Sequence, residues 1–222
     1  MAIPRAAGPR LIATEADIRD GVRALRRKCR YARAMHDATG DPPLRRNAAG
    51  FAGLARIIVG QQVSVASAAA IWGRLETAVA PFDAQRYLAL SDAALRTCGL
   101  SRGKVRTLHA VATALEAGEL NLEALEAASD DAVHAALSGM HGIGPWTADI
   151  YILFCLGRRD AFAPNDLALQ VAAQMVMELD DRPAPAALVE IAERWRPWRG
   201  VAARMLWAYY KVVKESRSGA PV

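Results

Sequence analysis

Apolar residues recur along this chain at helical spacing, and alternation of apolar with polar residues over four or more positions is nearly absent. Over residues 17–35 the apolar side chains fall on one helical face, and arginines are spread around the rest. A strongly apolar stretch over residues 51–75 is interrupted only by Gly60-Gln61-Gln62. The pattern therefore predicts an almost all-α fold.

Capping residues divide the middle of the chain into successive helices. Ser91, Ser101 and Ser129 are expected to begin helices, because a serine side chain accepts a hydrogen bond from the backbone there. Gly99 and Gly118 are expected to end the helices that precede them, since glycine readily adopts the left-handed conformation.

Residues 139–148 predict two helices joined by a tight turn. Gly142 and Gly144 permit backbone angles that other residues avoid, and Pro145 suits the first position of a helix. The second helix then begins with free backbone N–H groups, where an anion such as a phosphate fits. A plain connection between two helices explains the same residues.

Asp166 follows Pro164-Asn165 and precedes an apolar helix that is expected to begin at Leu167. An aspartate in this position is a common helix N-cap. The same carboxylate is also suited to stabilising a developing cation, so the structural and catalytic roles are compatible. Further on, Trp207 and two tyrosines recur at helical spacing, which is typical of core residues and also of an aromatic pocket.

Composition and charge narrow the class of protein. The 222 residues carry a net charge of +5, which favours a polyanionic partner such as nucleic acid but also serves solubility. The longest uncharged apolar run, residues 150–156, is far shorter than the roughly 20 residues of a membrane helix. No signal-peptide stretch is visible, so we expect neither secretion nor a membrane partner. The three cysteines are widely spaced, which predicts neither disulfides nor a zinc or iron–sulfur site.

Five segments together resemble one family. They are the hairpin at 139–148, the Pro164-Asn165-Asp166 loop, residues 58–64 around Gln61-Gln62, Gly99-Leu100-Ser101 with Lys104, and residues 194–199. In this order and spacing they are similar to the helix-hairpin-helix DNA glycosylases, especially the alkylbase branch, DNA-3-methyladenine glycosylase II, in a compact form without the N-terminal β-rich domain. The resemblance covers about residues 45–210.

The resemblance implies an all-α fold of two helical lobes, with the helix-hairpin-helix motif at the cleft between them. We expect a single glycosylase domain over residues 1–222. One lobe is expected at about residues 45–145, and the other at about residues 1–44 together with 146–222.

The resemblance also implies roles for individual residues. Asp166 aligns with the catalytic aspartate. Expected pocket residues are Trp146, Trp207, Ile150 and Leu167. Expected DNA contacts are Gln61, Gln62, Ser101, Lys104, Gly142, Gly144 and Thr147. The backbone carbonyls of Ser138, Met140 and Ile143 are expected to hold a monovalent cation, Na or K. No other cofactor is expected.

Family members that cleave the DNA strand carry a lysine nucleophile where this chain has Trp146, and many carry a four-cysteine iron–sulfur cluster. The resemblance therefore implies a monofunctional base-excision-repair hydrolase that flips out alkylated purines and leaves an abasic site. Expected substrates are 3-methyladenine and 7-methylguanine, with ethenoadenine left open. The expected partner is double-stranded DNA containing damaged bases, bound by a monomer in the cytoplasm, or at the nucleoid in a prokaryote.

Other interpretations stay open at this point. A glycosylase for an oxidised or deaminated base would share Asp166 and the hairpin but differ in the pocket. A non-catalytic helix-hairpin-helix module that binds damaged DNA would lose nothing on Asp166→Asn. Lys104 fits either a DNA phosphate or plain solvent exposure, and either Gln61 or Gln62 is suited to entering the duplex.

Overall fold

A computed structural model describes residues 10–218, which form twelve α-helices and two short 3-10 helices. The helices are α1 (Glu15–Lys28), α2 (Arg30–Thr39), α3 (Gly50–Gly60), α4 (Val65–Val79), α5 (Ala84–Ala89), α6 (Asp92–Thr97), α7 (Arg102–Glu116), η1 (Ala124–Glu126), α8 (Asp130–Ser138), α9 (Pro145–Phe154), α10 (Leu167–Met177), α11 (Pro185–Ala192), η2 (Glu193–Trp195) and α12 (Arg199–Ser218). Within this part of the chain the β-structure amounts to one isolated bridge, between Leu11 and Arg158. The predicted all-α fold is confirmed.

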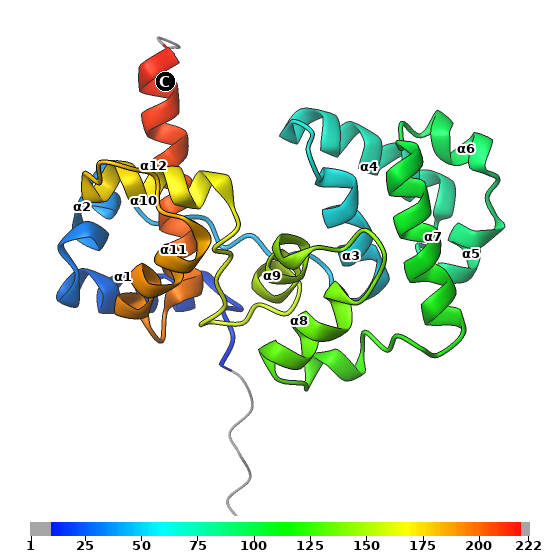
Figure 1. Cartoon of the computed structure of the whole chain (residues 1–222), viewed down its shortest axis with the longest axis horizontal. Coiled ribbons are helices and arrows are strands. Elements are labelled where there is room, and N and C mark those ends of the chain that lie inside the picture. The colour runs from blue at the N-terminus through cyan, green and yellow to red at the C-terminus, as the bar shows by residue number, and fades with distance from the viewer. Residues whose placement is uncertain (1–9, 219–222) are drawn as a thin grey trace, which may run out of the picture. The chain divides into compact units, whose positions relative to one another are not determined.

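The described chain divides into two compact units. Asn47–Leu156 contains α3 to α9, and residues 10–46 and 157–218 together contain α1, α2, α10, α11 and α12 (Figure 1). The second boundary therefore lies after Leu156 rather than near residue 145, where it was expected. The reason is that α9 packs against α8 and α3. Trp146 and Ile150 consequently belong to the same unit as the hairpin.

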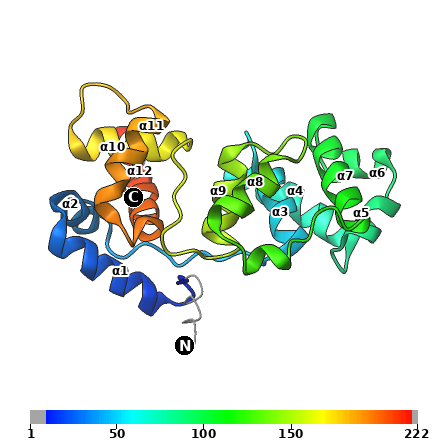
Figure 2. The same cartoon turned by 60° about the horizontal axis from the view of Figure 1, so that its bottom comes forward.

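Figure 2 shows the helices of the unit Asn47–Leu156 from a second direction. Buried apolar side chains form a core within this unit. Tyr87 on α5 and Leu108 on α7 are fully buried, where these two helices pack together. Phe82 packs against Phe51 and Trp72, with ring centroids 5.4 and 4.9 Å apart. This core supports α3 and α7, whose ends position Gln61, Ser101 and Lys104.

The predicted helix ends in this unit are confirmed. The side chains of Ser91, Ser101 and Ser129 each accept a hydrogen bond from the backbone N–H three residues later, at the starts of α6, α7 and α8. Gly99 and Gly118 have positive φ angles of 97° and 72°, in the left-handed region. Local capping chemistry therefore sets these boundaries.

In the other unit, α12 packs against α10, α2 and α1. Residues 201–206 of α12 are buried, and Trp195 just before the helix is fully buried against Phe162, with ring centroids 6.0 Å apart. This packing fixes the start of α10 and the middle of α12, which carry Asp166 and Trp207. None of the helices over residues 10–218 is long and apolar enough to span a membrane.

The single helix predicted over residues 17–35 is in fact two helices. Cys29 has extended backbone angles, φ −137° and ψ 118°, and separates α1 from α2. Leu25, Cys29 and Ala32 are all buried, so the apolar spacing continues across the break. The pattern of apolar residues therefore gave no sign of the interruption.

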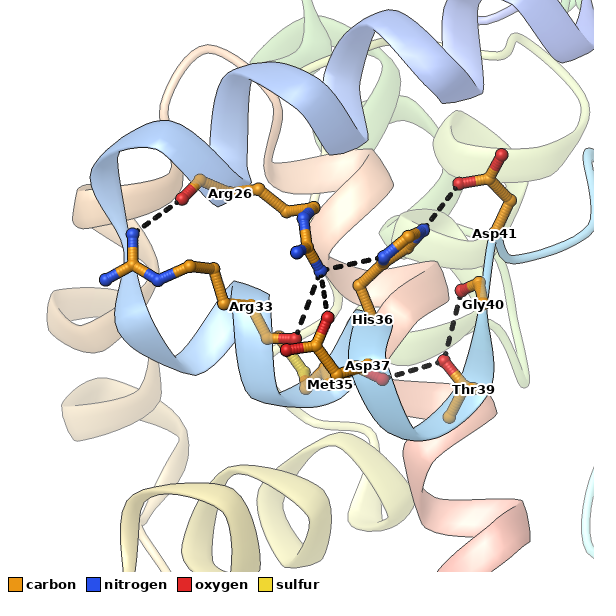
Figure 3. A network of polar contacts seen from close by, with 8 residues as sticks. All are labelled: Arg26, Arg33, Met35, His36, Asp37, Thr39, Gly40 and Asp41. Carbon is orange, nitrogen blue, oxygen red and sulfur yellow. Dashed lines mark hydrogen bonds and ion pairs between the residues drawn. The ribbon is translucent and has the colours of Figure 1, made fainter.

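A network of polar side chains joins α1 to α2 across this break (Figure 3). The Arg26 guanidinium pairs with Asp37 and lies 2.8 Å from His36 Nδ1, while Arg33 donates to the Arg26 carbonyl at 2.8 Å. On its other side, His36 Nε2 lies 2.9 Å from Asp41 Oδ1. These arginines therefore contribute to the joint between the two helices.

Candidate functional site

Asp166 is the N-cap of α10, as the sequence predicted. Its Oδ1 accepts a hydrogen bond from the backbone N–H of Leu169 at 3.1 Å. The same oxygen accepts a second hydrogen bond from Trp207 Nε1, also at 3.1 Å. A backbone N–H and an indole N–H together fix the orientation of this carboxylate.

The loop that leads to Asp166 is tied to the helix that follows it. Gln170 Nε2 donates to the Pro164 carbonyl at 2.9 Å, and the Asp166 N–H donates to the Ala163 carbonyl at 3.0 Å. Ala163 and Gln170 are both buried. Because a cap and a short turn hold the loop, the carboxylate is presented on a fixed backbone.

Two predicted pocket residues lie beside this carboxylate. Trp207 is half-buried on α12, and Leu167, the first residue of α10, has 56% of its surface exposed. The sequence suggested Trp207 as an aromatic wall but gave no sign of its hydrogen bond to Asp166. Trp207 and Asp166 are 41 positions apart, so no local spacing relates them.

The hairpin between α8 and α9 forms as predicted. Gly142 has a φ of 77°, and a Cβ atom there would lie 1.9 Å from Thr107 Oγ1 on α7. Gly144 is the N-cap of α9, and a Cβ atom built on it meets nothing within 4 Å. Pro145 is the first residue of α9. Gly142 is therefore required by packing, whereas Gly144 keeps the start of α9 open.

The expected phosphate contacts of the hairpin stay a prediction. In this structure the Thr147 N–H donates to the Gly144 carbonyl at 3.0 Å, and the Ile143 N–H donates to the Met140 carbonyl at 3.1 Å. Gly142 and Gly144 are both exposed. An anion at this turn would therefore meet exposed glycine backbone beside the N-terminus of α9.

The turn between α3 and α4 is joined to the hairpin. Gln61 Nε2 donates to Thr147 Oγ1 at 2.8 Å, and Thr147 is buried. Gln62 is exposed and has a positive φ of 54°. Val65, at the start of α4, has 88% of its surface exposed. All seven predicted DNA contacts lie in Asn47–Leu156, and this hydrogen bond connects two of the segments that carry them.

Lys104 has a partner within the protein. Its ammonium group donates to the Val59 carbonyl, near the C-terminus of α3, at 2.7 Å. Burial lowers the pKa of Lys104. A cation at a helix C-terminus complements the helix dipole, which explains why a lysine lies in the first turn of α7. Ser101, the N-cap of α7, is exposed.

The hairpin and the capped aspartate both lie in a stretch of the chain that matches one protein family. The sequence profile described as "HhH-GPD superfamily base excision DNA repair protein" matches residues 55–197. The chain belongs to the HhH-GPD superfamily. Within this superfamily it has curated relatives and solved structures that cover much of its length.

Three relatives show how much of each chain the similarity covers. The putative DNA-3-methyladenine glycosylase YfjP of Bacillus subtilis is 34% identical over 40% of this chain and 31% of its own length. The alkylbase DNA glycosidase-like protein mag2 of Schizosaccharomyces pombe is 26% identical over 75% of this chain and 81% of its own. The probable bifunctional transcriptional activator/DNA repair enzyme AlkA of Mycobacterium tuberculosis is 31% identical over 68% of this chain and 32% of its own length. The chain thus spans about a third of the first and third relatives.

Two solved structures have the same fold as this HhH-GPD chain. A DNA-3-methyladenine glycosidase from Bacillus halodurans is 28% identical, with a TM-score of 0.74 over 91% of this chain and 92% of its own. The 3-methyladenine DNA glycosylase of Schizosaccharomyces pombe, in complex with abasic DNA, is 23% identical. Its TM-score is 0.79, over 85% of this chain and 95% of its own. The second likeness is one of fold alone.

Two more predicted pocket residues lie on α9 of this HhH-GPD chain. Trp146 is half-buried in the first turn, and Ile150 lies one turn further on with 8% of its surface exposed. Both therefore share a helix with Thr147 of the hairpin.

The expected cation site on the hairpin carbonyls stays a prediction. Ser138 is the last residue of α8, and Met140 and Ile143 lie in the HhH-GPD turn that follows. The Met140 carbonyl accepts one hydrogen bond, from the Ile143 N–H, and a carbonyl oxygen has two lone pairs. No group of three or more His, Cys, Asp or Glu side chains within residues 10–218 is placed to hold a metal.

A half-buried acid between the two hairpin helices was not predicted. Asp149 on α9 lies with its Oδ1 3.6 Å from His134 Nε2 on α8, and His134 Nδ1 lies 3.5 Å from the Ser138 hydroxyl. Burial raises the pKa of Asp149 to about 7. The sequence did contain a signal, because Asp149 is the single charged residue of α9.

Proposed function

We propose that this chain is a monofunctional DNA glycosylase that hydrolyses the N-glycosidic bond of alkylated purines in double-stranded DNA and leaves an abasic site. The observation that carries the proposal is the oriented carboxylate of Asp166, held by Leu169 N–H and Trp207 Nε1 at the start of α10. Relatives named DNA-3-methyladenine glycosylase support alkylated purines as the substrate class.

The chemistry needs a carboxylate and a water molecule. A purine alkylated at a ring nitrogen is cationic, so the bond from its nitrogen to C1′ of the sugar is already weakened. That bond breaks with its electron pair passing to the base, which leaves as a neutral purine. Asp166 stabilises the positive charge that develops on the sugar. A water oxygen then bonds to C1′, and its proton passes to the carboxylate and on to solvent.

Aromatic faces provide selectivity for the damaged base. An electron-rich indole attracts a cationic ring by roughly 0.5–2 kcal/mol, and Trp146 and Trp207 are the proposed faces. Alkylated bases also pair more weakly, so extruding them from the duplex costs less than extruding a normal base. Together these effects favour 3-methyladenine and 7-methylguanine over undamaged purines.

The hairpin is the proposed site of DNA attachment. Backbone groups of Gly142, Gly144 and Thr147 would hold a phosphate at the start of α9. A monovalent cation on the carbonyls of Ser138, Met140 and Ile143 would neutralise part of the phosphate charge when bound. The exposed glycine backbone of the turn supports this role.

Trp146 supports a monofunctional reaction. It occupies the position at which the resemblance places a lysine nucleophile in strand-cleaving members. Without a lysine amine at that position, no Schiff base to C1′ is expected. Borohydride should therefore trap no covalent complex between the purified protein and lesion DNA.

The test is release of free base from methylated duplex DNA, followed by chromatography of the supernatant. Wild-type protein should release 3-methyladenine and 7-methylguanine, and Asp166→Asn should lower the rate by about a thousandfold. Asp180→Asn, at an exposed acid of the same unit, is the matched control and should keep full activity. Equal release by wild type and Asp166→Asn would contradict the proposal. A panel of oxidised and deaminated bases distinguishes the alternative substrates.

A further inference from the structure

The turn between α3 and α4 presents exposed side chains on a strained backbone. Gln62 has a φ of 54°, which side-chain-bearing residues rarely adopt. The next residue, Val63, is 39% exposed. Such a conformation persists only where the surrounding structure holds it. The contacts that hold this turn therefore determine how firmly its exposed side chains are positioned.

Gln61 makes the contact that joins the turn to another element. Its side-chain amide donates to Thr147 Oγ1 at 2.8 Å, across 86 residues of sequence. Thr147 has 2% of its surface exposed and belongs to the first turn of α9. The acceptor is thus a buried side chain in the helix that begins at the hairpin.

Further anchors lie on both sides of the turn. Before it, Lys104 on α7 donates to the Val59 carbonyl near the end of α3 at 2.7 Å. After it, Ser64 is the N-cap of α4 and accepts a hydrogen bond from Ser67 N–H at 3.1 Å. Gln61 supplies the one anchor among these that reaches the hairpin helix.

We infer that Gln61 is a positioning residue, whose amide locks the Gln62 turn to Thr147 so that the turn and the hairpin act on the duplex as one rigid body. The inference rests on the proposed function. Extruding a nucleotide costs a few kcal/mol of unstacking and unpairing, so a side chain that enters the duplex needs a support that does not yield. The Gln61 lock provides that support and leaves exposed Gln62 to meet the DNA.

The experiment breaks the hydrogen bond from either side. Gln61→Met and Thr147→Val remove the amide and the hydroxyl with little change of shape, whereas Thr147→Ser keeps the hydroxyl. Thr77→Val is the matched control, because the Thr77 hydroxyl donates to the Gly73 carbonyl within α4 and does not touch the turn. Single-turnover base release is measured on two duplexes, with the 7-methylguanine opposite cytosine or opposite an abasic site.

On the paired duplex, Gln61→Met and Thr147→Val should each slow base release about tenfold, and Thr77→Val should stay within about twofold of wild type. Thr147→Ser keeps the acceptor hydroxyl and should recover most of the rate that Thr147→Val loses. On the duplex with an abasic site opposite the lesion, the loss should shrink to about twofold, because little pairing remains to be broken. The double variant should lose no more than either single variant, since both remove the same hydrogen bond.

Three outcomes would overturn the inference: equal losses on the two duplexes, losses that multiply in the double variant, or full activity in both single variants. Fluorescence of 2-aminopurine placed beside the lesion reports extrusion without excision. If wild type releases no base, the proposed function fails. The same fluorescence comparison still tests the lock, which predicts weaker extrusion by Gln61→Met and Thr147→Val.

Discussion

Trp207 connects two elements that meet at the carboxylate. Its Nε1 donates to Asp166 Oδ1 at 3.1 Å, and its ring is half-buried on α12. A hydrogen bond to a charged group is stronger than one between neutral groups, because charge assistance shortens and strengthens it. The indole therefore orients the carboxylate, and its ring is one of the faces we propose for the damaged base.

Trp207→Phe should slow base release by about ten- to a hundredfold, because it keeps an aromatic ring but removes the N–H donor to Asp166. Single-turnover release from 7-methylguanine DNA measures the effect. Tyr210→Phe, on the next turn of α12, is the control for an aromatic substitution and should behave as wild type. An unchanged rate in Trp207→Phe would show that the hydrogen bond does not matter for the reaction.

The two hairpin glycines should respond differently to alanine. Gly142→Ala should lower the free energy of unfolding by about 2–4 kcal/mol, because its Cβ would collide with Thr107 Oγ1 and its φ of 77° disfavours a side chain. Gly144→Ala should keep wild-type stability, since its Cβ meets nothing within 4 Å. The added methyl group would instead obstruct a phosphate and weaken DNA binding. Urea unfolding and fluorescence anisotropy with duplex DNA separate the two effects.

For single residues, the sequence revealed structural roles that depend on neighbours in the chain. Asp166 could be identified as a helix cap, and Gly142 as a turn residue. The hydrogen bonds from Trp207 to Asp166 and from Gln61 to Thr147 could not be predicted, because each joins residues that only the tertiary fold brings together.

Helix boundaries were predictable where a capping residue sets them. Ser101 begins α7 through its own side chain, and such chemistry is visible in the sequence. The break at Cys29 is different, because side-chain contacts between the two helices, such as that of Arg33 with the Arg26 carbonyl, span it rather than a capping residue. Since the apolar stripe continues across Cys29, the break has no local signature.

The pair of hairpin helices should make stability depend on pH. Burial raises the pKa of Asp149 to about 7, so the folded chain keeps a proton between about pH 4 and pH 7 that the unfolded chain releases. This contribution to stability is complete below about pH 4 and is lost as the pH rises through about 7.

From pH 5 to pH 8 the wild-type free energy of unfolding should therefore fall by about 2 kcal/mol more than that of Asp149→Asn. Urea unfolding at the two pH values measures the difference. Asp131→Asn, at an exposed acid of α8, is the control and should follow wild type. Parallel pH profiles for wild type and Asp149→Asn would contradict the prediction.

Over the whole molecule, the net charge of +5 is consistent with binding a polyanion. Contacts with phosphates release condensed counterions, so affinity for duplex DNA should fall at least about tenfold between 50 and 200 mM salt. Undamaged and lesion-containing duplexes should show the same slope, because backbone contacts do not depend on sequence. Fluorescence anisotropy at several salt concentrations measures this, and a flat profile would contradict it.

The all-α architecture followed from apolar spacing, but the division into units did not. The second boundary was expected before α9, whose long apolar run gives no sign of which unit it joins. Packing of α9 against α8 and α3 decides the matter. A boundary between units depends on which helices pack together, and local sequence patterns do not show that packing.

The hydrogen bond from the Asn47 N–H to the Phe154 carbonyl, 3.0 Å long, has a consequence for how such proteins diversify. It brings together the two ends of the unit Asn47–Leu156, so one uninterrupted stretch of the gene encodes a module that begins and finishes at the same place. Recombination could therefore exchange this module between related genes in a single event. Chimaeric proteins that take this module from one relative and the rest of the chain from another are an accessible evolutionary step, and an equally accessible engineering one.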